Sequence, residues 1–366
     1  MIRVLVVDDS ALVRKLFGRV LSAEPDFEVG FARNGLEALE QLAQFKPDVI
    51  TLDVQMPEMD GLACLDRIMV QRPCPVVMVS TITAEGAAAT LDALQLGAVD
   101  FVAKPAGAVS LGMDEFAPTL KSKIRAAATA RLPASRRLRE RVQFRTSGSP
   151  PARIRKAVSE PVEPSVEPAR GDGVVVVGTS TGGPPALEAL LVPLSGSFRW
   201  PIVIAQHMPR GFTGPLAKRL NGICSLEVVE VSGPVRIAPG CAYIGRGDAD
   251  VVVSRRMTEL IATSVPSKVD YPWHPSTDRL VRSAMAHLPA SQLIGVLMTG
   301  MGNDGAAAMT ALRAEGGVTI AESEETAVVW GMPGELVRGG GASFVLPLTR
   351  IATRLQQLVP DHATRT

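Results

Sequence analysis

The chain has 366 residues, 46% of them hydrophobic, with 38 Lys and Arg against 37 Asp and Glu. This length can bury more than one core and favours about two domains. The near-zero net charge gives no global argument for nucleic-acid or membrane binding.

The cellular location of the protein is predicted from the absence of membrane-spanning and secretory segments in its sequence. No stretch reaches the roughly 18 apolar residues that a membrane span needs, and the apolar run before the first two acids is too short for a secretory signal. The cysteines show neither C-x-x-C spacing nor a zinc pattern: they are Cys64, Cys74, Cys224 and Cys241. We therefore expect a cytoplasmic, non-membrane protein with reduced thiols.

The first third of the chain alternates short apolar segments with amphipathic ones. The predicted strands are residues 2–7, 27–32, 48–53, 75–80 and 98–104. Five such units predict an α/β fold in which helices cover both faces of a parallel sheet. Ligands of such sheets bind beyond the carboxyl ends of the strands.

Five polar residues fall at those strand ends. Asp8 and Asp9 close the first strand and Asp53 closes the third, so three carboxylates converge on one rim. A hard divalent cation is the usual way to neutralise such a group, and Mg²⁺ is the expected metal. Ser80 and Lys104 add a hydroxyl and a cation that could hold a phosphoryl group on a carboxylate. Asp53, in the middle, is the best acceptor.

These motifs resemble a known domain. VLVVDDS, LDVQMPEMDGL and DFVAKP are similar to the response-regulator receiver domain over residues 2–120. The resemblance implies a flavodoxin-like fold and phosphorylation of Asp53 by a phosphohistidine donor. The implied Mg²⁺ ligands are Asp8, Asp9, Asp53 and the backbone carbonyl of Gln55. Ser80 stands where Thr is commoner and keeps the hydroxyl, whereas Asp60 and Asp100 are interpreted as helix-cap or turn residues.

The composition then changes to a Pro-, Ser- and Arg-rich stretch with little periodicity. It predicts a flexible linker at 126–172 between a receiver domain at 1–125 and a second domain at 173–360. Residues 121–156 hold twelve Lys and Arg but one acid, Glu140. A solvated tether is the simpler interpretation of this charge, and an electrostatic dock for an acidic partner is the alternative.

The second domain again alternates strands and helices. The predicted strands are residues 174–178, 201–208, 225–231, 241–245, 251–254, 292–300, 318–322 and 342–347. The Gly- and Pro-rich connections and the strand pairs around 241–263 suggest a mostly parallel α/β sheet with some antiparallel hairpins.

The stretch VVVVGTSTGGPP delivers one hydroxyl, Ser180, to a tight turn between a strand and a helix. Glycines permit the turn, and Pro184 and Pro185 suit a first helical turn. A serine nucleophile needs a base and a carboxylate that orients the base. His207 in AQHMP and Asp304 in LMTGMGNDGA each follow an apolar strand. Three strand ends would then meet at one cleft.

Other assignments stay open at this point. His274 and His287 are alternative bases, and His362 in the tail can be set aside. The string also satisfies the G-x-S-x-G pattern of α/β-hydrolases, which would need Asp250 or Asp270 followed by one of those histidines. Neither histidine closes a clear strand, and the domain is short for that fold. Dinucleotide binding is disfavoured because GTSTGG lacks the G-x-G-x-x-G spacing and no Walker lysine follows it.

Together with the receiver, GTSTGG, QHMP and TGMGNDGA resemble the chemotaxis response-regulator methylesterase (CheB) family. The resemblance implies a phosphorylation-activated serine hydrolase that cleaves glutamate methyl esters on chemoreceptors, releases methanol and also deamidates receptor glutamines. The phosphodonor would be the chemotaxis histidine kinase. We predict that Ser180 attacks, His207 transfers the proton and Asp304 orients the imidazole, without a cofactor. The backbone N–H groups near Thr181 and Met301 are candidates for the oxyanion hole.

The tether predicts how such an enzyme is controlled. A linked receiver can cover the Ser180 cleft, and phosphorylation of Asp53 could shift the balance toward the open state. Two rival functions come from other classes. A DNA-binding regulator would need a basic recognition helix, which the strand-rich second domain does not offer. A phosphorylation-dependent adaptor would bind receptors without turnover, and methanol release would exclude it.

Overall fold

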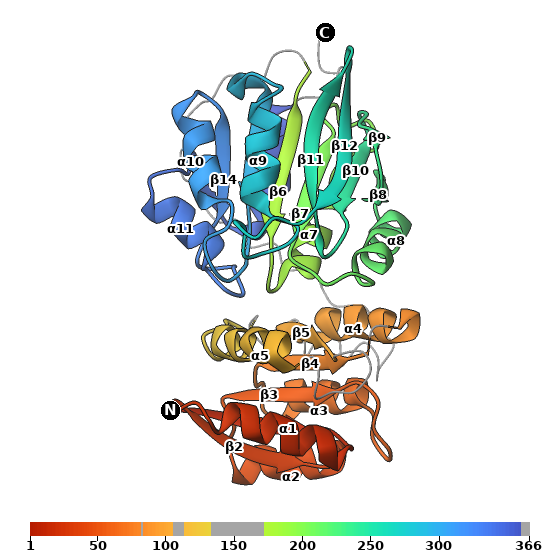
Figure 1. Ribbon diagram of the computed structural model, residues 1–366, viewed down its shortest axis with the longest axis vertical. Helices are drawn as coiled ribbons and strands as arrows, with labels where there is room; N and C mark the ends of the chain where they lie inside the picture. Colours follow the sequence, from red (N-terminus) through yellow and green to blue (C-terminus); the bar gives the residue numbers. More distant parts are fainter. Residues whose placement is uncertain (82, 105–112, 133–171, 360–366) are drawn as a thin grey trace, which may run out of the picture.

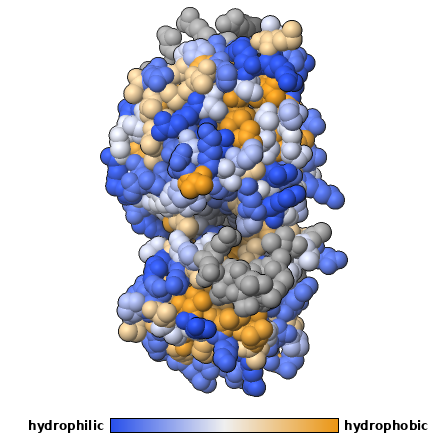
Figure 2. Space-filling model, in the orientation of Figure 1, coloured by the Kyte–Doolittle hydropathy of each residue, from blue (hydrophilic) through white to orange (hydrophobic). Residues whose placement is uncertain are grey.

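The computed structural model describes residues 1–81, 83–104, 113–132 and 172–359. Most of the predicted linker, 126–172, lies outside these ranges. The described chain forms two lobes that meet at a narrower waist (Figure 2). Among the described residues, no helix has the length and apolar character needed to cross a bilayer.

The N-terminal lobe is built on a five-stranded parallel sheet with the order β2-β1-β3-β4-β5. Its strands are β1 (Ile2–Val7), β2 (Phe27–Ala32), β3 (Val49–Asp53), β4 (Val76–Ser80) and β5 (Asp100–Ala103). Its helices are α1 (Ala11–Leu21), α2 (Gly35–Gln44), α3 (Gly61–Gln71), α4 (Ala84–Leu96) and α5 (Met113–Ala128). The central strands β3 and β4 are buried along their whole length, as expected when helices cover both faces. The predicted fold class of this part is confirmed.

Local signals set the starts and ends of these helices. The Asp60 carboxylate accepts a 2.8 Å hydrogen bond from the N–H of Ala63 and so caps α3, as predicted for this residue. Helix α4 ends at Gly97, whose φ of 114° lies in the left-handed region that glycine adopts without strain.

The C-terminal lobe is built on a seven-stranded, all-parallel sheet with the order β15-β14-β13-β6-β7-β10-β8. Its strands are β6 (Val174–Thr179), β7 (Ile202–Gln206), β8 (Glu227–Val231), β10 (Cys241–Gly245), β13 (Leu293–Leu297), β14 (Val318–Glu322) and β15 (Phe344–Leu346). A separate antiparallel sheet contains β9 (Val235–Arg236), β11 (Ala249–Arg256) and β12 (Glu259–Pro266). The expected mixture of a parallel sheet and a hairpin is confirmed. The hairpin is β11–β12, whereas β10 joins the parallel sheet.

The helices of this lobe are α7 (Gly183–Leu191), α8 (Thr213–Ile223), α9 (Thr277–Met285), η1 (Ala290–Gln292), α10 (Ala306–Ala314), α11 (Met332–Arg338) and α12 (Leu348–Leu358). Strand β6 lies between β7, which follows it in the chain, and β13, which comes more than a hundred residues later. The strand order therefore reverses at β6. In open α/β sheets the crevice beyond such a reversal is where ligands bind.

The two lobes meet through α4, β5 and α5 of the first, which face the lower end of the second in Figure 1. Phe101 of β5 packs on Phe212 with ring centroids 4.5 Å apart. Two polar contacts flank this pair. Gln95 Nε2 donates to Glu188 at 2.6 Å, and Arg219 pairs with Asp92 at 2.7 Å.

Candidate active site

The turn after β6 carries Ser180, which is buried, with 8% of the residue exposed. Gly182 has a φ of 76°, and a Cβ on Gly183 would lie 1.9 Å from Gln206 Oε1, so both positions require glycine. The Ser180 N–H donates to the carbonyl of Thr299 at 3.0 Å. The sequence therefore makes a tight turn that fixes the backbone of the predicted nucleophile.

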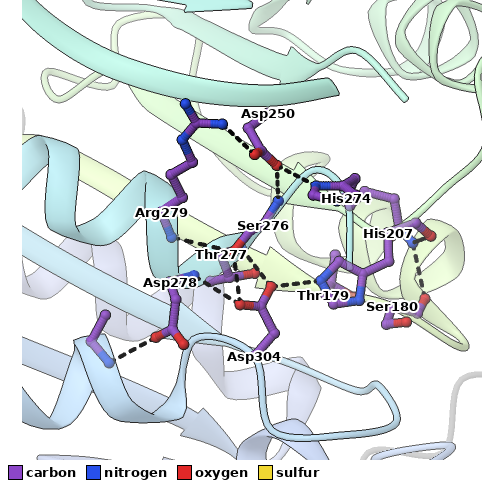
Figure 3. Close-up of polar contacts among 12 residues, drawn as sticks. Thr179, Ser180, His207, Asp250, His274, Ser276, Thr277, Asp278, Arg279 and Asp304 are labelled. Atoms are coloured by element: carbon purple, nitrogen blue, oxygen red, sulfur yellow. Dashed lines mark hydrogen bonds and ion pairs between the residues drawn. The ribbon is translucent and has the colours of Figure 1, made fainter. Parts of the chain in front are cut away.

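His207 is the residue that follows β7, the neighbouring strand. Its N–H donates to the carbonyl of Thr179 at 3.0 Å. The Gln206 side chain joins the two strand ends, because Nε2 donates to the carbonyls of Ser180 and His207, both at 3.0 Å. The pairing of Thr179 with Gln206 thus places Ser180 and His207 side by side (Figure 3).

Asp304 holds one edge of the imidazole. Its Oδ2 lies 2.8 Å from His207 Nε2. The other ring nitrogen, Nδ1, is buried and has no hydrogen-bond partner among the described residues. Figure 3 shows Ser180 on the side of the ring away from Asp304. Because the carboxylate can only accept, Nε2 carries the proton and Nδ1 keeps a lone pair.

Asp304 is itself held by the first turn of α9, and only 4% of it is exposed. It accepts hydrogen bonds from Ser276 Oγ at 3.0 Å and from the N–H groups of Thr277 and Asp278 at 2.6 and 3.0 Å. Burial alone would raise the pKa of Asp304, but His207 and these backbone donors hold it below its ordinary value. The carboxylate therefore stays ionised and can stabilise an imidazolium.

The remaining histidine candidates lie elsewhere. His274 Nδ1 lies 2.9 Å from Asp250, which also binds Arg279 at 2.6 Å. These two alternatives for the triad thus pair with each other. His287 is exposed beyond the end of α9. Sequence reasoning missed Trp273, whose ring stacks on His207 at 6.1 Å with an interplanar angle of 6°.

Both residues proposed for the oxyanion hole contact the N-terminal lobe. The Thr181 hydroxyl donates to Asp100, and the Ser122 hydroxyl lies 3.7 Å from the sulfur of Met301. Asp100 is not the cap or turn residue that its sequence context suggested. It begins β5, is 6% exposed and also binds Lys123 at 2.6 Å. No local pattern could reveal a partner 81 residues away in the chain.

The acidic rim of the N-terminal lobe forms as expected. Asp8, Asp9 and Asp53 each place a carboxylate oxygen within 4.8 Å of the others, a hard-oxygen set that suits Mg²⁺. Lys104 Nζ lies 2.7 Å from Asp53 and 3.0 Å from Asp8. Burial raises the pKa of Asp53, against the opposing effect of Lys104 and of the Gln55 N–H. Although burial opposes it, contact with the two carboxylates raises the pKa of Lys104.

The hydroxyl of Ser80, the predicted switch residue, bonds to backbone carbonyls. Ser80 is fully buried, and its Oγ donates to the carbonyl of Gly86 at 3.1 Å and to that of Thr81 at 3.3 Å. The structure therefore places the Ser80 hydroxyl against the first turn of α4.

Comparison with known proteins decides the family. The family model for CheB methylesterase matches residues 175–355, and that for the response regulator receiver domain matches residues 4–112. A protein-glutamate methylesterase/protein-glutamine glutaminase 2 of Rhodopseudomonas palustris is 56% identical, covering 96% of each chain. The chain belongs to the CheB methylesterase family. A protein-glutamate methylesterase/protein-glutamine glutaminase 3 of Rhodospirillum rubrum is 50% identical, covering 97% of this chain and 95% of its own.

A solved structure agrees with this CheB assignment. The CheB methylesterase catalytic domain of Thermotoga maritima is similar with a TM-score of 0.50 and 35% identity, covering 52% of this chain and all of that domain. The chain thus combines a receiver domain with a CheB catalytic domain, as the resemblance implied. The alternative assignment to the α/β-hydrolase family does not apply.

Proposed function

We propose that this chain is a phosphorylation-activated protein-glutamate methylesterase that hydrolyses glutamate 5-O-methyl esters on chemoreceptors and also deamidates receptor glutamines. The observation that carries the proposal is His207 Nδ1, which has no hydrogen-bond partner within the described parts of the chain and faces Ser180 while Asp304 holds Nε2. The names of the relatives supply the substrate class.

In the first half of the reaction, Ser180 Oγ attacks the ester carbonyl carbon while His207 Nδ1 takes its proton. The N–H groups of Thr181 and Met301 are the proposed donors to the oxyanion. The tetrahedral intermediate collapses, the carbon–oxygen bond to the methoxy group breaks, and His207 returns the proton to the leaving methanol. An acyl-enzyme on Ser180 remains.

In the second half, His207 takes a proton from water, whose oxygen attacks the acyl carbon. The bond to Ser180 Oγ breaks, Oγ takes the proton back, and the free glutamate carboxylate leaves. A glutamine side chain follows the same route with ammonia as the leaving group. Throughout, Asp304 orients the imidazole and offsets the charge of the imidazolium. The ester chemistry uses no cofactor.

Control comes from the receiver, which sits on the catalytic face. Its contacts to Thr181 and Met301 support inhibition by covering. Phosphorylation of Asp53 by the chemotaxis histidine kinase adds negative charge, which shifts the balance between covered and open states. Asp8, Asp9, Asp53 and the Gln55 carbonyl would hold a Mg²⁺ ion, which neutralises charge on the transferred phosphoryl group. Ser80 and Lys104 are the proposed switch residues.

The division of the chain follows from these roles. We assign residues 1–125 to the receiver, 126–172 to the linker, whose first three residues still belong to α5, and 173–360 to the catalytic domain. The proposed partners are methylated chemoreceptors and the kinase, met in the cytoplasm at the receptor array, with no role for nucleic acid.

The test is a methanol-release assay on a methylated receptor fragment, with and without a small phosphodonor and Mg²⁺. The wild type should release methanol faster with the phosphodonor, and Asp53→Asn should not respond to it. Ser180→Ala should lose at least about a thousandfold in rate. Turnover by Ser180→Ala near the wild-type rate would refute the nucleophile. Binding of the fragment without any release would instead favour the adaptor.

A further inference from the structure

Glu322 is a buried carboxyl with no part in the reaction described above. It is the last residue of β14 and is 0% exposed. Among residues 1–81, 83–104, 113–132 and 172–359, no Lys, Arg or His forms an ion pair with it, and, apart from burial, the groups that affect its pKa are Thr299 and Thr326. Burial raises its pKa to about 7. An unpaired buried carboxyl is costly, so its hydrogen-bond partners show what it does.

Both carboxyl oxygens accept hydrogen bonds. Oε2 accepts from the N–H of Thr299 at 2.8 Å, and Oε1 accepts from Thr326 Oγ1 at 2.9 Å. Thr299 comes shortly after β13, at the strand end next to Glu322, and is 1% exposed. Glu322 therefore fixes the peptide group that precedes Thr299.

Thr299 in turn holds three consecutive residues of the nucleophile turn. Its carbonyl accepts from Thr179 Oγ1 at 3.1 Å and from the Ser180 N–H at 3.0 Å. Its hydroxyl donates to the carbonyl of Thr181 at 2.8 Å. The turn that carries Ser180 thus rests on Thr299, and Thr299 rests on Glu322.

We propose that Glu322 is a positioning residue, which acts through Thr299 to hold Ser180 in line with His207. This inference rests on the proposed esterase function. Without the acceptor at Glu322, the N–H of Thr299 has no partner in a closed interior, and the peptide can turn. A displacement of about 1 Å at a reacting atom can cost about a hundredfold in rate.

Three substitutions of Glu322 distinguish the effect of its side-chain length from that of its charge. Glu322→Gln keeps an oxygen for Thr299 and offers an amide to Thr326, but removes the charge. Glu322→Asp keeps the charge but is one methylene too short to reach Thr299. Glu322→Leu removes both. Thr319→Val is the matched control, because Thr319 lies on the same strand, is 0% exposed and bonds to Ser343 rather than to the catalytic turn.

The full chain is assayed for methanol release from a methylated receptor fragment, with saturating phosphodonor and Mg²⁺. Each rate is divided by the concentration of folded protein, which thermal denaturation gives as the folded fraction at the assay temperature. We expect kcat of Glu322→Leu to fall about 10- to 100-fold and that of Glu322→Asp about tenfold, with KM within about twofold. Glu322→Gln should stay within about threefold of the wild type, and so should Thr319→Val.

Two results would overturn the proposal. One is a kcat for Glu322→Leu no lower than that of Thr319→Val, which would leave only a structural role. The other is a kcat for Glu322→Gln as low as that of Glu322→Asp, which would make charge the important property. If Glu322→Leu does not fold, the kcat of Glu322→Gln compared with that of Glu322→Asp decides whether the proposal holds. Failure of the esterase function itself would look different, because the wild type would then release no methanol.

Discussion

The orientation of one imidazole carries the chemistry at the scale of single residues. Asp304 binds Nε2 of His207 and thereby leaves Nδ1 as the base. Asp304→Asn could instead present its amide to Nε2, which would put the proton on Nδ1. We expect a loss of about a thousandfold or more in kcat, by analogy with carboxylate-to-amide changes in other triads. Methanol release measures the loss, and a kcat within tenfold of the wild type would contradict this role of Asp304.

A pH dependence of stability follows from Glu322. Its pKa rises from 4.5 to about 7 on folding, so the native state holds the proton more tightly than the unfolded state between these values. Relative to Glu322→Gln, the free energy of unfolding of the wild type should fall as pH rises from about 5 to about 7 and then level off. Denaturant unfolding at several pH values measures this difference. A difference that does not change with pH would show that the pKa is not raised.

The residues that the sequence could identify are those that follow an apolar strand in a turn or loop marked by glycine or proline. Ser180 and Asp304 lie in glycine-rich stretches that follow strands, and His207 directly follows the strand β7 and precedes a proline by two residues. Asp100 and Glu322 carry no such mark, because their important partners, Thr181 and Thr299, come from remote parts of the chain. Their significance depends on packing, which the spacing of residues does not encode.

At the scale of elements, the turn from β6 to α7 depends on a close approach at Gly183. A Cβ there would press on Gln206, whose amide ties Ser180 to His207. Gly183→Ala should therefore lower kcat by about tenfold or more by displacing the turn. Gly222→Ala is the control, because a Cβ at Gly222 in α8 meets no atom of the described residues within 4 Å. Equal methanol-release rates for the two variants would show that the contact is dispensable.

Strand positions were predictable because buried parallel strands are short, apolar and separated by turn residues. Strands β1 and β10 begin and end where expected. The pairing of β10 was less certain, because its sequence fits a hairpin as well as a parallel sheet. Only β7 and β8, which flank it, settle that it belongs to the main sheet.

At the scale of the whole molecule, the receiver touches the catalytic turn through Asp100. Removing that carboxylate should weaken the covered state, so Asp100→Ala should raise methanol release without phosphodonor several-fold. Asp92→Ala is the control: Asp92 also crosses the interface, to Arg219, but its side chain is 58% exposed, and such pairs contribute little. A chain without residues 1–140 should show the upper limit of this increase. Unchanged or lower release from that chain would exclude inhibition by covering.

The shared use of one face has a consequence for timing. If a methylated receptor helix binds at the proposed active site, it and the receiver cannot both occupy the surface around Thr181, which Asp100 of the receiver contacts. Thermodynamic linkage is reciprocal: if acyl phosphate on Asp53 favours release of the receiver, a bound helix must favour the acyl phosphate to the same degree. Under the proposed function, a high local density of methylated receptors would then prolong the phosphorylated state of Asp53. Esterase activity would decay first where few methyl esters remain.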